Sequence, residues 1–299
     1  MMQSNNWGEF LLPILRRIFD KHLTDMKDFL PVMYNVEKST KAQEFTHGVG
    51  SLGLMVPWSD SGNQVSYETV HPGYKATYTH IKYSKGLQIE RELLDDAQYP
   101  EVKKRVKTLT DSVYYTRQFH VAYPFNNCTG MLGPDGKALA ATDHPLGPKN
   151  SSTWSNYNAS LDLTADNVEI VRNAMKDWTD DKGNLLAINP DTLIVPKAKR
   201  KAALVIADSP KEPDTAENNV NIWKGSVDVI EWDFLTDPTM WFMVDRRRMK
   251  NYLTWYDRRM PKLDTHNLFD NEVSLYKTVG RWSYGWDDAT FLYAAKAAS

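Results

Sequence analysis

The chain lacks the features that most secreted, membrane-spanning or zinc-binding proteins show. Its single cysteine, Cys128, excludes an intrachain disulfide framework and a zinc site built from several cysteines. No stretch approaches the roughly 18 apolar residues that a membrane span needs. The short apolar run at 10–15 meets Arg16 and Arg17 at once, so we expect no signal peptide and a protein kept in the cytoplasm. We expect Cys128 to be a small buried residue rather than a reactive thiol.

The chain also lacks a surplus of charge of either sign. Its formal net charge is −2, whereas domains dedicated to nucleic acids are usually strongly basic. Balancing acidic residues favour ion pairs or helix surfaces, rather than phosphate binding, as the use of the basic clusters. These clusters are 103–105, 197–201, 246–248 and 258–259.

Recognisable catalytic and cofactor motifs are missing as well. Gly48–Gly53 matches the residue pattern of the dinucleotide-binding fingerprint. That fingerprint needs a helix directly after it, and no helix is predicted there. No phosphate loop occurs, and the seven histidines are not at metal-ligand spacing. Asp143 beside His144 is better read as a loop-stabilising pair than as a general base or metal ligand, and 180–184 as a turn rather than a calcium loop. We therefore expect no enzyme activity, no cofactor and no metal.

Aromatic residues, by contrast, are plentiful, with 10 Trp and 15 Tyr in 299 residues. Such side chains anchor protein interfaces, but they also fill cores, and the composition leaves both interpretations open. The length suffices for one large domain or two modest ones.

Periodicity predicts a long β-hairpin in the first third of the chain. Residues from Tyr67 to Tyr83 alternate between two faces, and His71–Gly73 reads as the turn. Before it, an amphipathic helix is predicted over 7–30, stopped by Pro31 and followed by a polar linker. An isolated two-stranded hairpin is marginal in water, so this hairpin is expected to lie on another surface, its own or a partner's.

Helical patterns dominate the next part of the chain. An apolar stripe, 102, 106, 109 and 113, predicts a long helix over 99–123, ended by Pro124. The region 161–261 reads as an α+β unit whose first helix is capped by Thr164 and carries the stripe 168, 171, 175 and 178. Its further predicted elements are a strand in 185–196, a helix over 197–207, and strands at 227–232 and 240–245. The tail, 272–293, is predicted as a strand.

Seven short motifs, in this order along the chain, resemble the major head subunits of Mu-like tailed bacteriophages. They are Gly86–Asp96, Asp135–Leu139, Thr142–Pro145, Leu193–Pro196, Asn218–Ile222, Trp241–Val244 and Arg281–Trp286. The resemblance implies an α+β fold of the Hong Kong 97 type. Its parts would be an N-terminal arm (1–53), an extended β-hairpin loop (54–90), a peripheral domain with a spine helix (91–160 and 262–299) and an axial domain (161–261).

The same resemblance implies a structural subunit that assembles into an icosahedral head around phage DNA. The expected partners are further copies of the chain in hexamers and pentamers, a separate scaffold protein, a portal, a possible decoration protein, and double-stranded DNA held by non-specific contacts. The expected location is the virion, with assembly in the host cytoplasm and no membrane contact. No covalent crosslink through Lys75, Lys82 or Lys85 is predicted.

Aromatic residues of the hairpin and the tail are the candidate anchors between subunits. They are Trp58, Tyr74, Tyr78 and Trp282. On this hypothesis Tyr78→Asp leaves a soluble monomer that does not assemble. Two alternatives stay open: a cellular compartment shell of the encapsulin type, which would contain cargo protein, and a monomeric carbohydrate-binding or hydrolytic protein.

Overall fold

The computed structural model describes residues 7–55, 58, 67–90, 92, 93, 96, 98–210, 220–268 and 273–297, with the side chains of 7–10, 267 and 268 left out. The chain forms two compact units, each built from three separate segments. Unit 1 comprises 1–44, 78–121 and 255–284, and unit 2 comprises 45–77, 122–254 and 285–299. Among the described helices, none is both long and apolar enough to cross a membrane.

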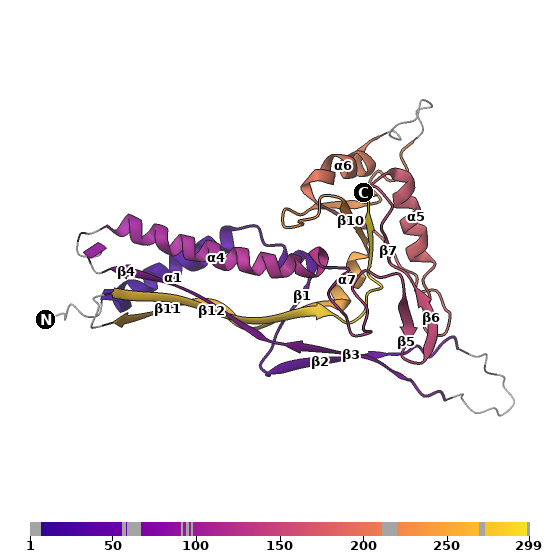
Figure 1. Ribbon diagram of the computed structural model, residues 1–299, viewed down its shortest axis with the longest axis horizontal. Helices are drawn as coiled ribbons and strands as arrows, with labels where there is room; N and C mark the ends of the chain where they lie inside the picture. The colour runs from indigo at the N-terminus through magenta and orange to yellow at the C-terminus, as the bar shows by residue number, and fades with distance from the viewer. Residues whose placement is uncertain are drawn as a thin grey trace. The chain divides into compact units, whose positions relative to one another are not determined.

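Unit 1 is a four-stranded sheet with helices on one face (Figure 1). The strand order is β1 (Asn35–Lys38), β11 (Leu253–Leu268), β12 (Val273–Trp286) and β4 (Ile81–Glu90). The helices are α1 (Trp7–Asp25), the single turn α2 (Leu30–Met33) and α4 (Tyr99–Asn126). The apolar stripe predicted for α4 is buried, and it packs with α1 and with Leu263 and Tyr276 of the sheet. The long helix is therefore confirmed.

Two predicted boundaries in the helices are wrong. The N-terminal helix stops at Asp25, not at residue 30, and Pro31 lies in the first turn of α2 rather than terminating α1. A proline is tolerated there because first-turn amides have no partner within the helix. For α4, Pro124 lies within the last turn and the helix continues to Asn126.

The predicted hairpin is wrong in its pairing. The supposed turn at His71–Gly73 is the start of β3 (Pro72–Thr79), and β3 pairs with β2 (Gln43–Val49), a segment expected to be polar linker. The next strand, β4, joins the other sheet, pairing antiparallel with β12. Alternation shows that a segment is extended, but it does not say which strand lies beside it.

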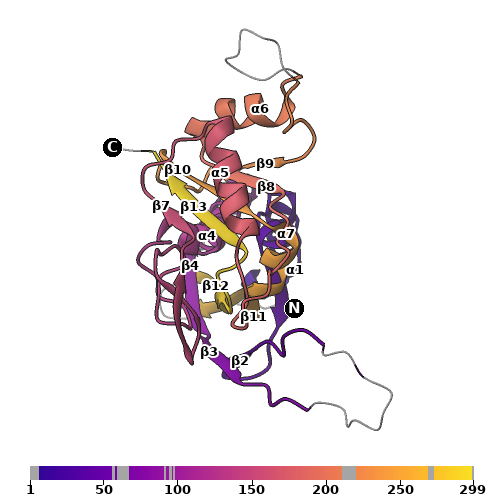
Figure 2. The same cartoon turned by 90° about the vertical axis from the view of Figure 1, so that its right-hand side faces the viewer.

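Unit 2 contains a five-stranded sheet covered by helices, which Figure 2 shows with α5 in front of it. The order is β7 (Tyr157–Asn158), β13 (Leu292–Lys296), β10 (Met240–Val244), β8 (Thr192–Val195) and β9 (Asp228–Glu231). Helix α5 (Ala165–Lys176) begins with the predicted cap, since Thr164 Oγ1 accepts the Asn167 amide hydrogen. The stripe of α5 packs with α6 (Arg200–Asp208), which follows the 3-10 turn Lys197–Lys199, onto β8, β10 and β13. The helices and strands predicted for this region are confirmed as α5, α6, β8, β9 and β10.

The remaining elements were not predicted individually. A second two-stranded pair joins β5 (His144–Gly147) to β6 (Asn150–Trp154), and the short helix α7 (Arg246–Tyr252) follows β10. The 16-residue strand β11 passes through position 261, where the sequence pattern placed a domain boundary. Its charged residues and Pro261 obscure the alternation of apolar and polar residues that would have indicated a strand.

Candidate assembly surface

The segment from the end of β2 to the start of β3 carries an unusual density of exposed apolar side chains. The described ones are Val49 (77% exposed), Leu52 (54%), Leu54 (81%), Met55 (98%), Trp58 (72%) and Tyr67 (90%). We call residues 50–71 the extended loop and β2–β3 its ribbon. Soluble monomers rarely expose apolar residues in such groups, and exposed groups usually mark interaction surfaces.

The ribbon is narrow because two glycines face each other across it. A Cβ on Gly73 would lie 2.7 Å from the carbonyl carbon of Gly48, which is too close for any side chain. Two residues further along, the Gly50 amide donates to the His71 carbonyl at 3.0 Å. The partner's residue number falls as the first strand's rises, as in antiparallel strands. Phe45, on β2, is covered by the Lys75 ammonium 4.2 Å from its ring centre.

Side chains of unit 2 hold the base of the extended loop. Asp181 accepts the Ser51 amide hydrogen at 3.0 Å, and Asp287 accepts the hydroxyl hydrogen of Thr46 at 2.5 Å. Where the loop returns towards β3, the Glu68 carboxylate lies 3.5 Å from the Lys182 ammonium. The base of the extended loop is therefore anchored, and the apolar residues described on the loop are exposed.

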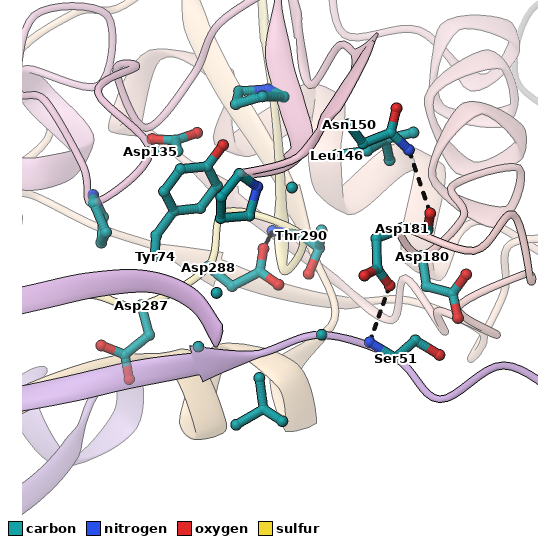
Figure 3. A pocket seen from close by; sticks show the side chains of 18 of the residues that line it. Ser51, Tyr74, Asp135, Leu146, Asn150, Asp180, Asp181, Asp287, Asp288 and Thr290 are labelled. Carbon is teal, nitrogen blue, oxygen red and sulfur yellow. Dashed lines mark hydrogen bonds between the residues drawn. The ribbon is translucent and has the colours of Figure 1, made fainter. Parts of the chain in front are cut away.

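Four of these residues, Ser51, Asp181, Lys182 and Asp287, line a groove of about 910 Å³, shown in Figure 3. Its walls come from the ribbon, the β5–β6 turn, residues 179–182 and residues 286–290. The lining carries five carboxylates, Asp135, Asp180, Asp181, Asp287 and Asp288. Across the described residues, no group of three or more His, Cys, Asp or Glu side chains is arranged to hold a metal ion.

Of the four aromatic residues proposed from the sequence, two are not buried in the subunit. Trp58 is on the extended loop. Tyr74 is half-buried in the groove, where burial, reinforced by the Asp135 carboxylate, raises the pKa of its phenol.

The other two aromatic residues belong to the core of unit 1. Tyr78 is 3% exposed and makes an edge contact with Tyr256 at 5.1 Å. Trp282 is 2% exposed and stacks on Tyr83 at 4.5 Å. A carboxylate at position 78 would be buried, so the structure leads us to expect Tyr78→Asp to destabilise the subunit itself rather than leave a stable monomer.

The residues considered for chemistry have structural roles. His144 is 1% exposed, stacks on Trp154, and places Nδ1 2.6 Å from Asp135 Oδ2. Its sequence neighbour Asp143 pairs instead with Lys137. The loop-stabilising interpretation of His144 is confirmed, with a different carboxylate.

The other two motifs also resolve into ordinary structure. Asp180 accepts the amide hydrogens of Lys182 and Asn184, which closes the predicted turn. Cys128 is 1% exposed, and burial raises the pKa of its thiol to about 12.

The exposed leucines and methionine of the extended loop were not among the residues predicted from the sequence. A signal for them exists: 52–58 is an apolar run interrupted by Gly53 and Pro57, without helical or strand periodicity. An apolar run that fits no regular element has no obvious way to bury itself within its own chain.

Comparison with known proteins identifies the type of protein to which this surface belongs. A protein family described as phage capsid protein matches residues 74–295. The chain belongs to the phage capsid protein family. It is a structural major capsid protein, and its place is the virion.

Solved structures agree with this capsid protein in fold at low sequence identity. The capsid of bacteriophage JBD30, decorated with minor capsid protein trimers, matches with a TM-score of 0.58 at 16% identity, covering 72% of this chain and 93% of that one. The mature capsid of bacteriophage PhiM1 matches at 0.56 and 11%, covering 91% and 88%. None of the curated proteins compared with this capsid protein matches it.

A virus-like particle from Pyrococcus furiosus also matches, with a TM-score of 0.58 at 10% identity and coverage of 95% and 99%. Fold similarity alone therefore does not separate a phage head from another shell, and the family match decides for the capsid. This capsid protein has the Hong Kong 97-type fold that the motifs implied, whereas membership of the Mu-like branch stays a prediction.

Proposed function

We propose that this capsid protein builds a closed head by laying its extended loop on a neighbouring copy. The observation that carries the proposal is the group of exposed apolar residues on a loop whose base is anchored. Burying such residues against a second copy removes apolar area from water at about 25 cal/mol per Å². The anchored base limits the conformational freedom that association would otherwise remove.

The proposed assembly has hexamers and pentamers of this chain enclosing double-stranded DNA, without catalysis by the subunit. Each contact need be only moderate, because a subunit in a closed shell is held on several sides at once. A separate scaffold protein, a portal and a decoration protein belong to the same proposal. We further propose that unit 1 contains the peripheral domain and that 161–254 forms the axial domain of unit 2.

A charge placed on the extended loop tests the proposal. Leu54→Asp is expected to leave a folded subunit that forms no particles, because the leucine is 81% exposed in the free subunit but would be buried in the shell. Leu185→Asp is the matched control, since Leu185 is a 67% exposed leucine of the same unit outside the loop. Trp58→Asp should behave like Leu54→Asp.

Assembly is measured by size-exclusion chromatography with light scattering and by negative-stain microscopy, with scaffold co-expression if the wild-type chain stays monomeric. Circular dichroism checks that the variants fold. Normal particles from Leu54→Asp and Trp58→Asp would remove the extended loop from the assembly mechanism. Nucleic acid inside wild-type particles supports a genome-containing head, and cargo protein in its place contradicts it.

A further inference from the structure

Strand β4 is an open edge of the unit 1 sheet. It stands last in the strand order β1, β11, β12, β4, so β12 is its one neighbour in that sheet. Within the part of the chain that the structure describes, no backbone hydrogen bond joins Ile81–Glu90 to a segment other than β12. The backbone amides and carbonyls on the outer side of β4 are therefore available to a further strand.

This edge is long and regular. Its 10 residues, Ile81 to Glu90, each face a residue of β12 without a register shift. Edges that must stay unpaired are often short, bulged or interrupted by proline, and β4 has none of these features. Lysines are a further protection against unwanted pairing, and β4 carries Lys82 and Lys85. The positions of these two charges restrict which strand the edge accepts.

The two faces of β4 differ in their surroundings. The ring of Tyr83 lies 4.6 Å from that of His120 of α4, and Ile89 packs in the cluster that contains α1 and α4. The odd-numbered residues of β4 therefore face the helices, and the even-numbered residues point away from them. All of the even-numbered residues are exposed, and they are Lys82, Ser84, Gly86, Gln88 and Glu90.

The even-numbered face carries one charge of each sign, near its two ends. Lys82 and Glu90 are about 26 Å apart along the strand, so they do not pair within one subunit. Among the described residues, neither of them forms an ion pair. Lys82 even lies opposite Arg281 of β12, and like charges in this position destabilise a sheet. A negative charge on the outer side of Lys82 would offset this repulsion.

A second copy of β4, antiparallel to the first, supplies such a charge. With Gly86 opposite Gly86 of the partner subunit, Lys82 lies opposite Glu90 of the partner subunit, and the reverse pair forms as well. Ser84 then lies opposite Gln88 of the partner subunit, which allows a hydrogen bond between the side chains. Opposite residues of antiparallel strands point to the same face, so the whole even-numbered face is complementary to itself.

The neighbouring registers fit less well. Backbone groups alternate in direction along a strand, so the second β4 shifts only in steps of two residues. One step in one direction places Lys85 opposite Lys85 of the partner subunit, a repulsive pair. One step in the other direction shortens the paired segment and leaves Lys82 beyond its end. Charge and length therefore both favour the register centred on Gly86.

We propose that β4 pairs antiparallel with β4 of a second copy, about a two-fold axis at Gly86. The sheets of the two subunits then join at their β4 edges through residues Lys82–Glu90 of both strands, with about eight to ten backbone hydrogen bonds. The contact is isologous, like the interfaces of most dimers of identical chains. It goes beyond the proposed function, because it does not involve the extended loop.

A charge exchange tests this contact between copies. Lys82→Glu and Glu90→Lys, each alone, place like charges opposite each other twice, which should raise the dissociation constant of the dimer about tenfold. The double variant restores two opposite pairs and should return to near the wild-type value. Since the two positions are too far apart to interact within one subunit, recovery reports contact between subunits. Lys103→Glu, at an exposed lysine of α4, is the control and should leave the constant unchanged. Sedimentation equilibrium of the full chain measures dimerisation, and circular dichroism checks folding.

Crosslinking tests the register. In the double variant Ser84→Cys with Gln88→Cys, each new thiol faces one of the partner subunit at the Cα separation that a disulfide needs. Oxidation should give a covalent dimer in the free chain and in particles. Ser84→Cys alone should give none, because residues 84 of the two copies are about 13 Å apart in this register. The native Cys128 is buried, so it should not contribute to the crosslink.

Two results would overturn the proposal. One is the absence of a crosslink from the double cysteine variant in both the free chain and particles. The other is a double charge variant that dimerises no better than the single ones. Covalent dimers from Lys85→Cys in place of the double cysteine variant would also contradict it, because they require the shifted register.

Addition of Leu54→Asp separates this contact from the extended loop. The double cysteine variant that also carries Leu54→Asp should still form the covalent dimer, although it should form no particles. Crosslinked dimers from a wild-type background that never forms particles, even with a scaffold, contradict the proposed head and leave this contact supported. Normal particles without the crosslink contradict this contact alone.

Discussion

Replacing Arg117 by Met should be among the most destabilising single changes in unit 1. The Arg117 and Asp257 side chains are 9% and 4% exposed, and Nη1 lies 3.1 Å from Oδ1. A second contact joins Nη2 to Oδ2 at 3.2 Å, so the guanidinium and the carboxylate form a two-bond pair. Methionine keeps much of the side-chain volume but leaves Asp257 charged and buried. Among the described residues, only the Trp255 indole hydrogen would still be donated to its carboxylate.

The expected decrease in stability follows from the geometry. At 3.1 Å and an effective dielectric constant of about 20, the attraction of the pair is about 5 kcal/mol. Desolvation of both charges offsets part of this when the pair is intact, but removing one partner leaves the cost of the other uncompensated. Breaking such a buried pair costs roughly 3–5 kcal/mol. The substitution also removes the guanidinium from two indole rings, whose centres lie 5.3 Å and 5.6 Å away.

Urea unfolding of the unassembled subunit, followed by tryptophan fluorescence, measures the decrease. The matched control is Arg259→Met, because Arg259 pairs with Asp264 at 3.3 Å while 54% exposed. Exposed ion pairs contribute about 0–1 kcal/mol to the free energy of unfolding, so Arg259→Met should shift the midpoint of urea unfolding only slightly. Adding Asp257→Asn to Arg117→Met should recover part of the stability by removing the unpaired charge. If Arg117→Met shifted the midpoint no more than Arg259→Met, the reasoning about burial would be refuted.

Three further predictions follow from single residues. Cys128, with a pKa raised by burial to about 12, should resist iodoacetamide in the native subunit and react only in urea; native labelling would contradict its burial. Asp181→Ala removes the acceptor of the Ser51 amide and should raise hydrogen exchange and proteolysis in the extended loop, whereas Asp166→Ala, in the first turn of α5, should not. Burial, then Arg281, lowers the pKa of His80 below its usual value of about 6.5, so the unfolded chain binds the proton more tightly. Stability should therefore fall as the pH drops from about 7.5 through 6.5, and less steeply in His80→Gln; an equal pH slope would contradict this.

Much of the helical structure was predictable because it depends on neighbours within the same turn or two. The stripes of α4 and α5 and the Thr164 cap are such local patterns, and all are found in the structure. The strands β8, β9 and β10 were found because they are short apolar runs between turn signals.

Strand pairing was not predictable, because alternation carries no information about partners. The first strand of the expected hairpin, β3, pairs with β2, and the next, β4, pairs with β12 nearly 200 residues further along the chain. Strand β11 was missed for a different reason, because its alternation mixes buried aromatic residues with charged ones.

The candidate interface residues also fall into two groups, those that the sequence could identify and those that the fold decides. From composition alone, Tyr78 and Trp282 were as good candidates for interface anchors as Trp58, since all are large aromatic residues near strands. Their burial was decided by which surfaces the fold brings over them, Tyr256 for one and Tyr83 for the other.

The sequence by itself determined the apolar stripes of α4 and α5, the type of fold and the family, because these rest on local periodicity and on motif order. Only the tertiary structure decided which aromatic residues stay exposed and which strands pair, such as β4 with β12. Both depend on contacts between segments far apart in the chain, and no local pattern encodes such contacts.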